Sequence, residues 1–362
     1  PCSWYGKIVP MSDTTAWQQQ MQYTRTATTW LPECSQCRDA ERAGIDWLVS
    51  RKIAEKNVPE DSQDGHVTYL ELGFDITCNA ACVGCSSELS TGWQEFEQGH
   101  GLKDHGRRVS KKFRSHQAAD CQTRVSDKST DQGDVLLAQI KSQLSIMNLK
   151  KIFILGGEPF YSRSHLPLLR WLSDTHPDLG QVVLKYQSNG SIYPNKETLE
   201  HWKKFKHIEY GVSIDGVGQR FDYLRWPSKW DQVSHNVIRL ANQVPIKLFV
   251  NSVASPFSAL YWEEINQWLW HNFGHSGVLK PGANPRTQPG HDWLHLKYAS
   301  TQLRLLIFKK YGTDHVVRKL VKQAGYESDL RPMLDYFHGM DKLRNLDWRR
   351  VFPEVSGCYP VI

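Results

Sequence analysis

Short apolar runs alternate with amphipathic helical patterns along the middle of the chain. Strands are predicted at 69–75, 151–155, 181–186, 208–212 and 246–253, where apolar residues run together or alternate with polar ones. Apolar residues at helical spacing predict helices at 135–147, 166–174, 196–205, 230–243 and 260–273. A weak sixth strand is expected near 278–279, before a Gly/Pro-rich loop that reaches Gly290. Short strands that alternate with helices indicate a parallel α/β sheet.

This α/β region is predicted to span 66–290, between a small unit at 1–60 and a helical cap at 291–362. Residues 86–133 form a polar insertion with weak hydrophobic periodicity, in which basic residues gather between Lys103 and Arg114. A charged run of this kind usually forms a solvated face. The alternative is a basic flap that covers the mouth of the barrel that the α/β region would form and that meets an anionic substrate.

The first strand leads into a loop of small and polar residues that carries Cys78, Cys82 and Cys85 in C-x3-C-x2-C spacing. Thiolates suit a soft metal centre. Three thiolates on a 4Fe–4S cube leave one iron open to a substrate or cofactor. Two other interpretations remain: a zinc site completed by a distant Cys or His, and buried thiols without a ligand.

Three further motifs follow strand ends in order: Gly156-Gly157-Glu158-Pro159, Ser188-Asn189-Gly190 and Ser213-Ile214-Asp215-Gly216. Together with the cysteine loop, they resemble the radical S-adenosylmethionine (radical SAM) superfamily. The resemblance implies a partial (β/α)6 TIM-like barrel in which the three cysteines hold a 4Fe–4S cluster and SAM chelates its open iron. It also implies reductive cleavage of SAM to a 5′-deoxyadenosyl radical, which takes a hydrogen atom from a substrate.

The same resemblance suggests which residues contact SAM. Gly156 and Gly157 allow close approach of the backbone, and Glu158 can accept a hydrogen bond from the SAM ammonium. Arg225 could pair with the SAM carboxylate or form a structural ion pair. The remaining candidates, each also a plausible turn former or structural residue, are Ser188, Asn189, Ser213, Asp215 and Asn251. Gly84 stands where many members of the family have an aromatic residue beside the adenine, so that contact must come from elsewhere.

The unit at 1–60 contains Cys2 and the pair Cys34-x2-Cys37. With the glutamate, glycine, serine and arginine that follow, the pair resembles the pattern of a twitch unit, a reduced SPASM-type domain, although one gap is slightly longer. The resemblance implies an auxiliary 4Fe–4S cluster on these three cysteines, with Cys358, Cys121 or a residue upstream as fourth ligand. A CxxC zinc site is the alternative.

Composition adds few constraints. The 362 residues can bury a barrel core and still carry a smaller unit, and no run of about 18 apolar residues predicts a membrane span. The eight cysteines, without a visible secretion signal in a sequence that starts at Pro1, indicate metal ligands in a cytoplasmic protein. The formal charge of +6 permits an acidic partner without requiring one.

We therefore expect a cytoplasmic radical SAM enzyme that receives electrons from a donor such as flavodoxin or ferredoxin. SPASM and twitch relatives often modify peptides or proteins, which makes a peptide the expected substrate. One alternative is radical dehydrogenation or rearrangement of a sugar or nucleotide. The other is a zinc-stabilised nucleic-acid-binding module, although nucleic acid is not the expected partner.

Overall fold

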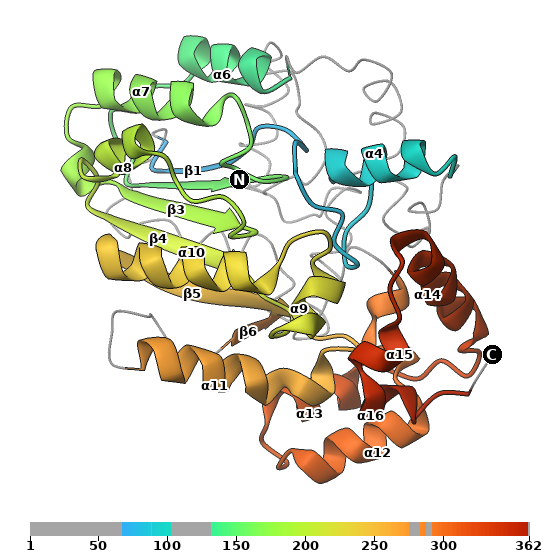
Figure 1. The fold of residues 1–362 in the computed structure, drawn as a ribbon. Coiled ribbons are helices and arrows are strands. Elements are labelled where there is room, and N and C mark those ends of the chain that lie inside the picture. Colours follow the sequence, from blue (N-terminus) through green and yellow to red (C-terminus); the bar gives the residue numbers. More distant parts are fainter. Residues whose placement is uncertain (1–66, 88, 103–131, 275–282, 287–291, 361–362) are drawn as a thin grey trace, which may run out of the picture.

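The computed structural model describes residues 67–87, 89–102, 132–274, 283–286 and 292–360. Strands and helices alternate through most of this part of the chain, and a group of helices ends it (Figure 1). The elements up to the last strand are β1 (Tyr69–Gly73), α4 (Thr91–Gly99), α6 (Gln132–Gln143), β2 (Lys151–Leu155), α7 (His165–Thr175), β3 (Val183–Ser188), α8 (Lys196–Trp202), β4 (His207–Ser213), α9 (Gln219–Leu224), α10 (Trp230–Gln243), β5 (Ile246–Val253), α11 (Trp262–Phe273) and β6 (Ala283–Arg286). After them come α12 (Thr301–Lys310), α13 (Val316–Gln323), α14 (Arg331–Arg344), α15 (Trp348–Val351) and α16 (Pro353–Ser356).

The strands form one parallel sheet in which β1 to β6 follow one another in sequence order. Each strand pairs with the next, so that Leu72 lies opposite Ile154 and Ile208 lies opposite Ile246. Parallel neighbours need a crossover connection, and the helices supply it. The predicted fold class, a partial (β/α)6 barrel with C-terminal helices, is confirmed. Because the strands are parallel, their carboxyl ends meet along one edge of the sheet.

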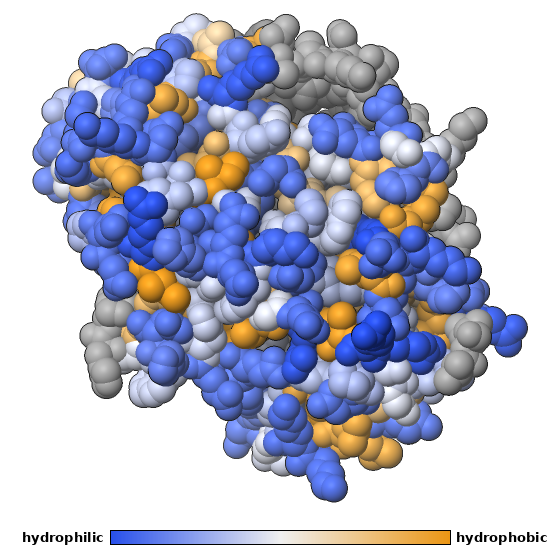
Figure 2. Space-filling view, viewed as in Figure 1, coloured by the Kyte–Doolittle hydropathy of each residue, from blue (hydrophilic) through white to orange (hydrophobic). Residues whose placement is uncertain are grey.

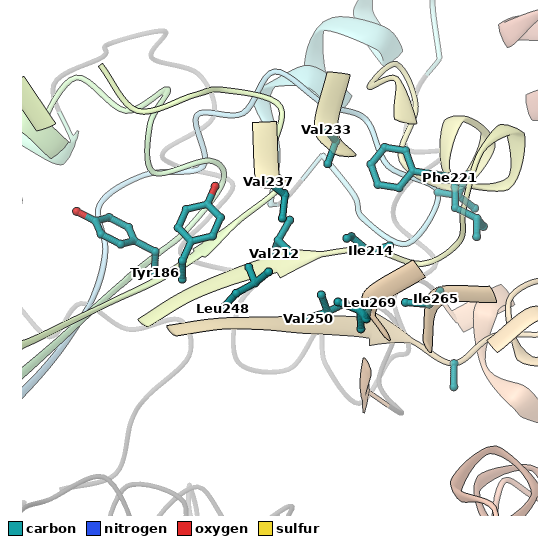
Figure 3. Close-up of a cluster of buried hydrophobic side chains, with 14 of the residues drawn as sticks. Tyr186, Val212, Ile214, Phe221, Val233, Val237, Leu248, Val250, Ile265 and Leu269 are labelled. Atoms are coloured by element: carbon teal, nitrogen blue, oxygen red, sulfur yellow. The ribbon is translucent and has the colours of Figure 1, made fainter. Parts of the chain in front are cut away.

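The hydrophobic core lies between the sheet and the helices that cover it (Figure 3). On β3, the residues at 184, 186 and 188 are buried, whereas those at 183, 185 and 187 are only partly buried. This alternation assigns the first set to the helix-covered face and the second to the opposite face of the sheet. Residues that meet in this core layer include Val212, Leu248 and Val250 from the sheet, Val233 and Val237 from α10, and Ile265 and Leu269 from α11.

The C-terminal helices belong to the same hydrophobic core cluster as the sheet. The Tyr223 hydroxyl of α9 donates a hydrogen bond to Asp341 Oδ1 of α14 at 2.8 Å. The ring of Tyr223 also meets Phe352 edge-on, with ring centres 5.5 Å apart. These contacts pack α14, α15 and α16 beside α9, near the carboxyl edge of the sheet.

Most predicted elements lie where the hydrophobic pattern placed them, and α10 and β5 match to the residue. The predicted position of the sixth strand, 278–279, lies outside the described residues, and β6 is instead Ala283–Arg286, inside the expected Gly/Pro-rich loop. The strand predicted at 181–186 is β3 at Val183–Ser188, because Leu179–Gln181 forms a short 3-10 helix. The insertion predicted to begin at 86 contains the ordered helix α4, which was not predicted. The basic run at 103–114 lies outside the described residues.

The face of the molecule drawn in Figure 2 is largely hydrophilic, and its hydrophobic residues form small separate groups. Scattered apolar residues of this kind are normal on a folded surface. Within the described ranges, no helix combines the length and apolar character needed to cross a membrane.

Candidate active site

The loop after β1 brings its three cysteines together. Cys78 and Cys82 are each 9% exposed and form a buried cluster with Ala80, against which Cys85 packs. All three are free thiols, and the charge of each would act on its neighbours. The spacing predicted this convergence, and the structure places it at the carboxyl end of β1.

The start of α4 holds this loop from one side. The Cys78 amide donates to Thr91 Oγ1 at 3.0 Å, and the Thr91 hydroxyl donates back to the Cys78 carbonyl at 3.1 Å. Ser90, the N-cap of α4, donates its hydroxyl to the Ala80 carbonyl at 2.5 Å. Trp93 Nε1 donates to the Cys82 carbonyl at 2.8 Å. These bonds fix the loop backbone and so restrict the directions in which the thiols point.

The Gly156-Gly157 turn lies against the backbone that leads to Cys78. The Gly157 amide donates to the Asp75 carbonyl at 3.2 Å, and the Glu158 amide donates to the Thr77 carbonyl at 2.8 Å. Gly156 has a φ of +131°, a conformation that side chains rarely adopt. A Cβ on Gly157 would lie 2.3 Å from the Thr77 carbonyl oxygen, so only glycine fits there.

Glu158 is a fully buried carboxylate in this turn, with 0% exposure. It accepts hydrogen bonds from the Ser188 hydroxyl at 2.9 Å and from the amides of Asn189 at 2.6 Å and Phe160 at 3.3 Å. Burial raises the pKa of Glu158 to about 7, and the donated bonds from Asn189, Ser188 and Phe160 oppose that rise. Glu158 therefore joins the ends of β2 and β3, and its contact with SAM stays a prediction.

Asn189 connects this pair of strand ends to the cysteine loop. Its Nδ2 donates to Asn79 Oδ1 at 2.9 Å and lies 3.9 Å from Cys78 Sγ. Its Oδ1 accepts from the amide and the hydroxyl of Ser191, at 2.9 and 2.7 Å. The sequence predicted a site for Ser188 and Asn189, and the structure places both beside the thiols.

Asp215, which is buried, and Arg225, which is partly buried, form an ion pair, with Arg225 Nε 2.7 Å from Asp215 Oδ2. Asp215 also accepts a hydrogen bond from the Val253 amide at 2.7 Å, which joins the ends of β4 and β5. The structure shows Arg225 in an ion pair, and its contact with the SAM carboxylate stays a prediction. Arg225 also interacts with the Cys82 side chain and opposes the rise in the Cys82 pKa that burial causes.

Ser213 and Asn251 lie side by side in the register of β4 and β5. Both bond to Gln187 of β3, whose Nε2 donates to Ser213 Oγ at 2.8 Å and whose Oε1 accepts from Asn251 Nδ2. Sequence reasoning missed Gln187. The alternation along β3 carries the signal, because Gln187 falls on the face opposite the buried residues.

The chemistry of this donor set fits a cluster bound by three thiolates. Burial and the neighbouring thiols raise the pKa of Cys78 and Cys85 to about 12, so these thiols stay protonated until a cation displaces their protons. Among the described residues, no three His, Cys, Asp or Glu side chains are placed to hold a single metal ion. A 4Fe–4S cube distributes its thiolates over different irons and does not need them to reach one ion.

Of the other predicted ligands, Cys358 alone lies within the described residues. Cys2, Cys34, Cys37 and Cys121 lie outside the described residues. Cys358 is buried just after α16, where its thiol donates to the Glu354 carbonyl at 3.2 Å. Its role as a ligand of an auxiliary cluster stays a prediction.

Leu294 lies close to Gly84, so a side chain at this position would require Leu294 to shift. A Cβ there would lie 3.3 Å from Leu294 Cδ1, and Leu294 is itself buried. Leu294, from the segment between β6 and α12, therefore occupies the space beside Gly84.

No protein-family model matches this sequence, and no curated protein matches it. Solved structures with similarity to the chain include Streptococcus suis SuiB bound to S-adenosylmethionine, with a TM-score of 0.38 and 13% identity over 93% of this chain and 59% of that one. SuiB bound to the precursor peptide SuiA gives a TM-score of 0.38 and 13% identity over 93% of this chain and 60% of that one. Native anSMEcpe with bound AdoMet gives 0.37 and 14% over 57% of this chain and 49% of that one. The chain thus spans about 60% of the length of SuiB.

Proposed function

We propose that this protein is a radical SAM enzyme whose cluster and SAM bind at the carboxyl edge of the sheet. The observation that carries the proposal is the convergence of Cys78, Cys82 and Cys85 beside the Gly156-Gly157 turn and Glu158. Motifs 71 to 80 residues apart in sequence thus meet in the order and at the strand ends that the sequence resemblance implies.

In this proposal, Cys78, Cys82 and Cys85 hold the 4Fe–4S cluster as thiolates. When bound, the cluster and SAM supply reductive cleavage of SAM and removal of a hydrogen atom from the substrate. The chain supplies a loop that is fixed before the cluster binds, through the bonds from Thr91, Ser90 and Trp93. Such pre-organisation is what a protein contributes to cofactor chemistry.

Glu158 is the proposed acceptor for the SAM ammonium. Its carboxylate already accepts three hydrogen bonds, and an ionised carboxylate offers about four acceptor sites. An ammonium on the remaining lone pair would stabilise the charged form and lower the pKa of Glu158. Gln187, Ser213 and Asn251 form a polar group on the sheet face away from the helices, where the rest of the ligand and the substrate are proposed to bind.

We further propose a peptide or protein substrate, on the strength of the twitch-like pattern at 1–60. A sugar or nucleotide substrate is the second candidate, because the basic residues at 103–114 suit an anion. An oxygen-sensitive cluster needs a reducing compartment, so the proposed location is the cytoplasm and the proposed electron donor is a flavodoxin or ferredoxin.

Anaerobic reconstitution with iron and sulfide tests the cofactor assignment. The full chain should bind about four irons for one cluster, or about eight with an auxiliary cluster, and should convert SAM to methionine and 5′-deoxyadenosine when reduced. Protein that takes up zinc and no iron would overturn the assignment and favour a zinc-stabilised binding module.

A second assay identifies the substrate class. The reconstituted protein is incubated anaerobically with SAM, reductant and either a peptide library or a panel of sugars and nucleotides. Mass spectrometry should find a peptide whose mass changes only when SAM and reductant are both present. A mass change confined to a sugar or nucleotide would replace the peptide proposal and leave the cofactor assignment intact.

A further inference from the structure

We propose that Arg344, in the last turn of α14, positions the cysteine loop and raises the reduction potential of the cluster at Cys82. The inference rests on the proposed function, because it assumes that the three thiolates hold an iron–sulfur cluster. It assigns a role in the site to the C-terminal helices, which the roles proposed above do not include.

Arg344 reaches the cysteine loop directly. Its Nη2 donates a hydrogen bond to the carbonyl of Ala81 at 2.9 Å, across 263 positions of sequence. The side chain is buried, at 8% exposure, and Ala81 immediately precedes Cys82. A charged donor to a buried carbonyl is stronger than a neutral one, so the bond restrains the peptide next to the ligand.

Three aromatic rings enclose the guanidinium of Arg344. Its central carbon lies 4.8 Å from the ring centre of Trp93, 5.1 Å from that of Phe96 and 4.9 Å from that of Trp226. A planar guanidinium stacks well on aromatic faces, and a lysine ammonium does not reproduce that shape. These three rings, called the aromatic cage below, therefore hold the charge of Arg344 in one place.

The same cage residues also bond to the loop. Trp93 Nε1 donates to the Cys82 carbonyl at 2.8 Å, and the Trp226 carbonyl accepts from the Ala81 amide at 2.9 Å. The Leu224 carbonyl accepts from the Val83 amide at 2.8 Å. Two of these three bonds therefore come from Trp93 and Trp226, whose rings Arg344 packs against. Loss of Arg344 would remove a packing partner of both tryptophans.

The charge of Arg344 is available to the cluster. Within the described part of the chain, no carboxylate forms a salt bridge with Arg344, whereas Arg225, the other arginine near Cys82, is paired with Asp215. Asp341, on the same helix, accepts hydrogen bonds from Tyr223 and from the Trp348 amide, and it also interacts electrostatically with Arg344 without forming a salt bridge. Arg344 acts electrostatically on the Cys82 sulfur.

A cluster with thiolate ligands becomes one unit more negative when it accepts an electron from a low-potential one-electron donor. No bond to Arg344 forms or breaks in that step. A fixed positive charge in a buried, low-dielectric setting stabilises the reduced state more than the oxidised state. The midpoint potential of the cluster should therefore be higher with Arg344 than without it.

The test compares the reconstituted wild-type chain with Arg344→Met, Arg344→Lys and Lys342→Met. Methionine fills similar space without charge, lysine keeps the charge without the planar fork, and Lys342 is an exposed cation on the same helix that serves as control. The readouts are iron per chain, the thermal unfolding midpoint and the midpoint potential. The midpoint potential is followed by electron paramagnetic resonance, on the signal of the reduced cluster that changes when SAM is added. This change distinguishes the cluster on Cys78, Cys82 and Cys85 from an auxiliary cluster.

We expect Arg344→Met to lose iron and to shift the potential to more negative values. Arg344→Lys, which keeps the charge without the planar fork, should lose iron but keep a potential near wild type, and Lys342→Met should equal wild type in both. Wild-type iron and potential in Arg344→Met would overturn the proposal, whatever its unfolding midpoint. If Arg344→Met does not fold, Arg344→Lys decides: a potential near wild type supports the charge effect, and a shift to more negative values overturns it. Absence of iron from the wild-type protein would instead refute the proposed function.

Discussion

Gly157 offers a direct test of the contact between the β2 turn and the cysteine loop. In Gly157→Ala, the new Cβ would lie 2.3 Å from the Thr77 carbonyl oxygen and 2.7 Å from the carbonyl carbon of Ile76. Both are backbone atoms of the segment that leads to Cys78, so no side-chain rotation relieves the clash. Since real Cβ contacts essentially never fall under 3.0 Å, the two segments must separate by about 0.7 Å.

Such a separation weakens the two hydrogen bonds that join these segments, from the Gly157 amide to Asp75 and from the Glu158 amide to Thr77. Each contributes about 0.5–1.5 kcal/mol, and overpacking adds about 1–3 kcal/mol. We expect Gly157→Ala to destabilise the fold by about 2–4 kcal/mol and to reduce iron binding, because Cys78 moves with the displaced backbone.

The assay is denaturant unfolding of the chain together with iron per chain after anaerobic reconstitution. Gly73→Ala is the matched control, because it adds the same methyl group at the neighbouring strand end, where the nearest atom is 3.8 Å away. The control should unfold within about 0.5 kcal/mol of wild type and keep its iron. Equal unfolding free energies and equal iron in the two variants would refute the geometric reasoning.

Three further predictions concern charge and metal content. Glu158→Gln should keep the cluster but bind SAM roughly tenfold more weakly by calorimetry. Because burial raises the pKa of Glu158 to about 7, the affinity of the wild-type protein for SAM should rise as pH increases through about 7 and the carboxyl group ionises. The variant should lose this pH dependence. Burial lowers the pKa of His165 to about 4, so the folded protein keeps this side chain neutral beside Tyr186. The fold should therefore lose up to about 3 kcal/mol of stability as pH falls from about 6.5 to 4. When urea unfolding is compared at pH 7 and pH 5, His165→Asn should lose less stability than wild type, and an equal loss would count against the assignment. The triple variant of Cys78, Cys82 and Cys85 to Ala should fail to cleave SAM yet keep about four irons on an auxiliary cluster; zinc in place of iron there would leave a structural zinc site.

The sequence by itself determined the sheet and the position of the cysteines. Apolar runs bounded by polar turns predicted five of the six strands that the structure describes, since a strand buried against helices must supply apolar side chains whatever its neighbours are. Parallel strands bring their carboxyl ends to one edge, so the motifs at Cys78, Glu158, Asn189 and Asp215 could be expected to meet.

Only the tertiary structure decided which partners these groups take. Arg225 could have faced a ligand or a carboxylate, and the packing of α9 against the end of β4 pairs it with Asp215. The last strand, Ala283–Arg286, has almost no apolar pattern and exists because β5 offers it a free edge for backbone pairing. Arg344 reaches Ala81 because α14 folds back onto the barrel. The local pattern of apolar and polar residues predicts which face of each segment is buried. Contacts between segments far apart in sequence depend instead on how the assembled core orients those segments.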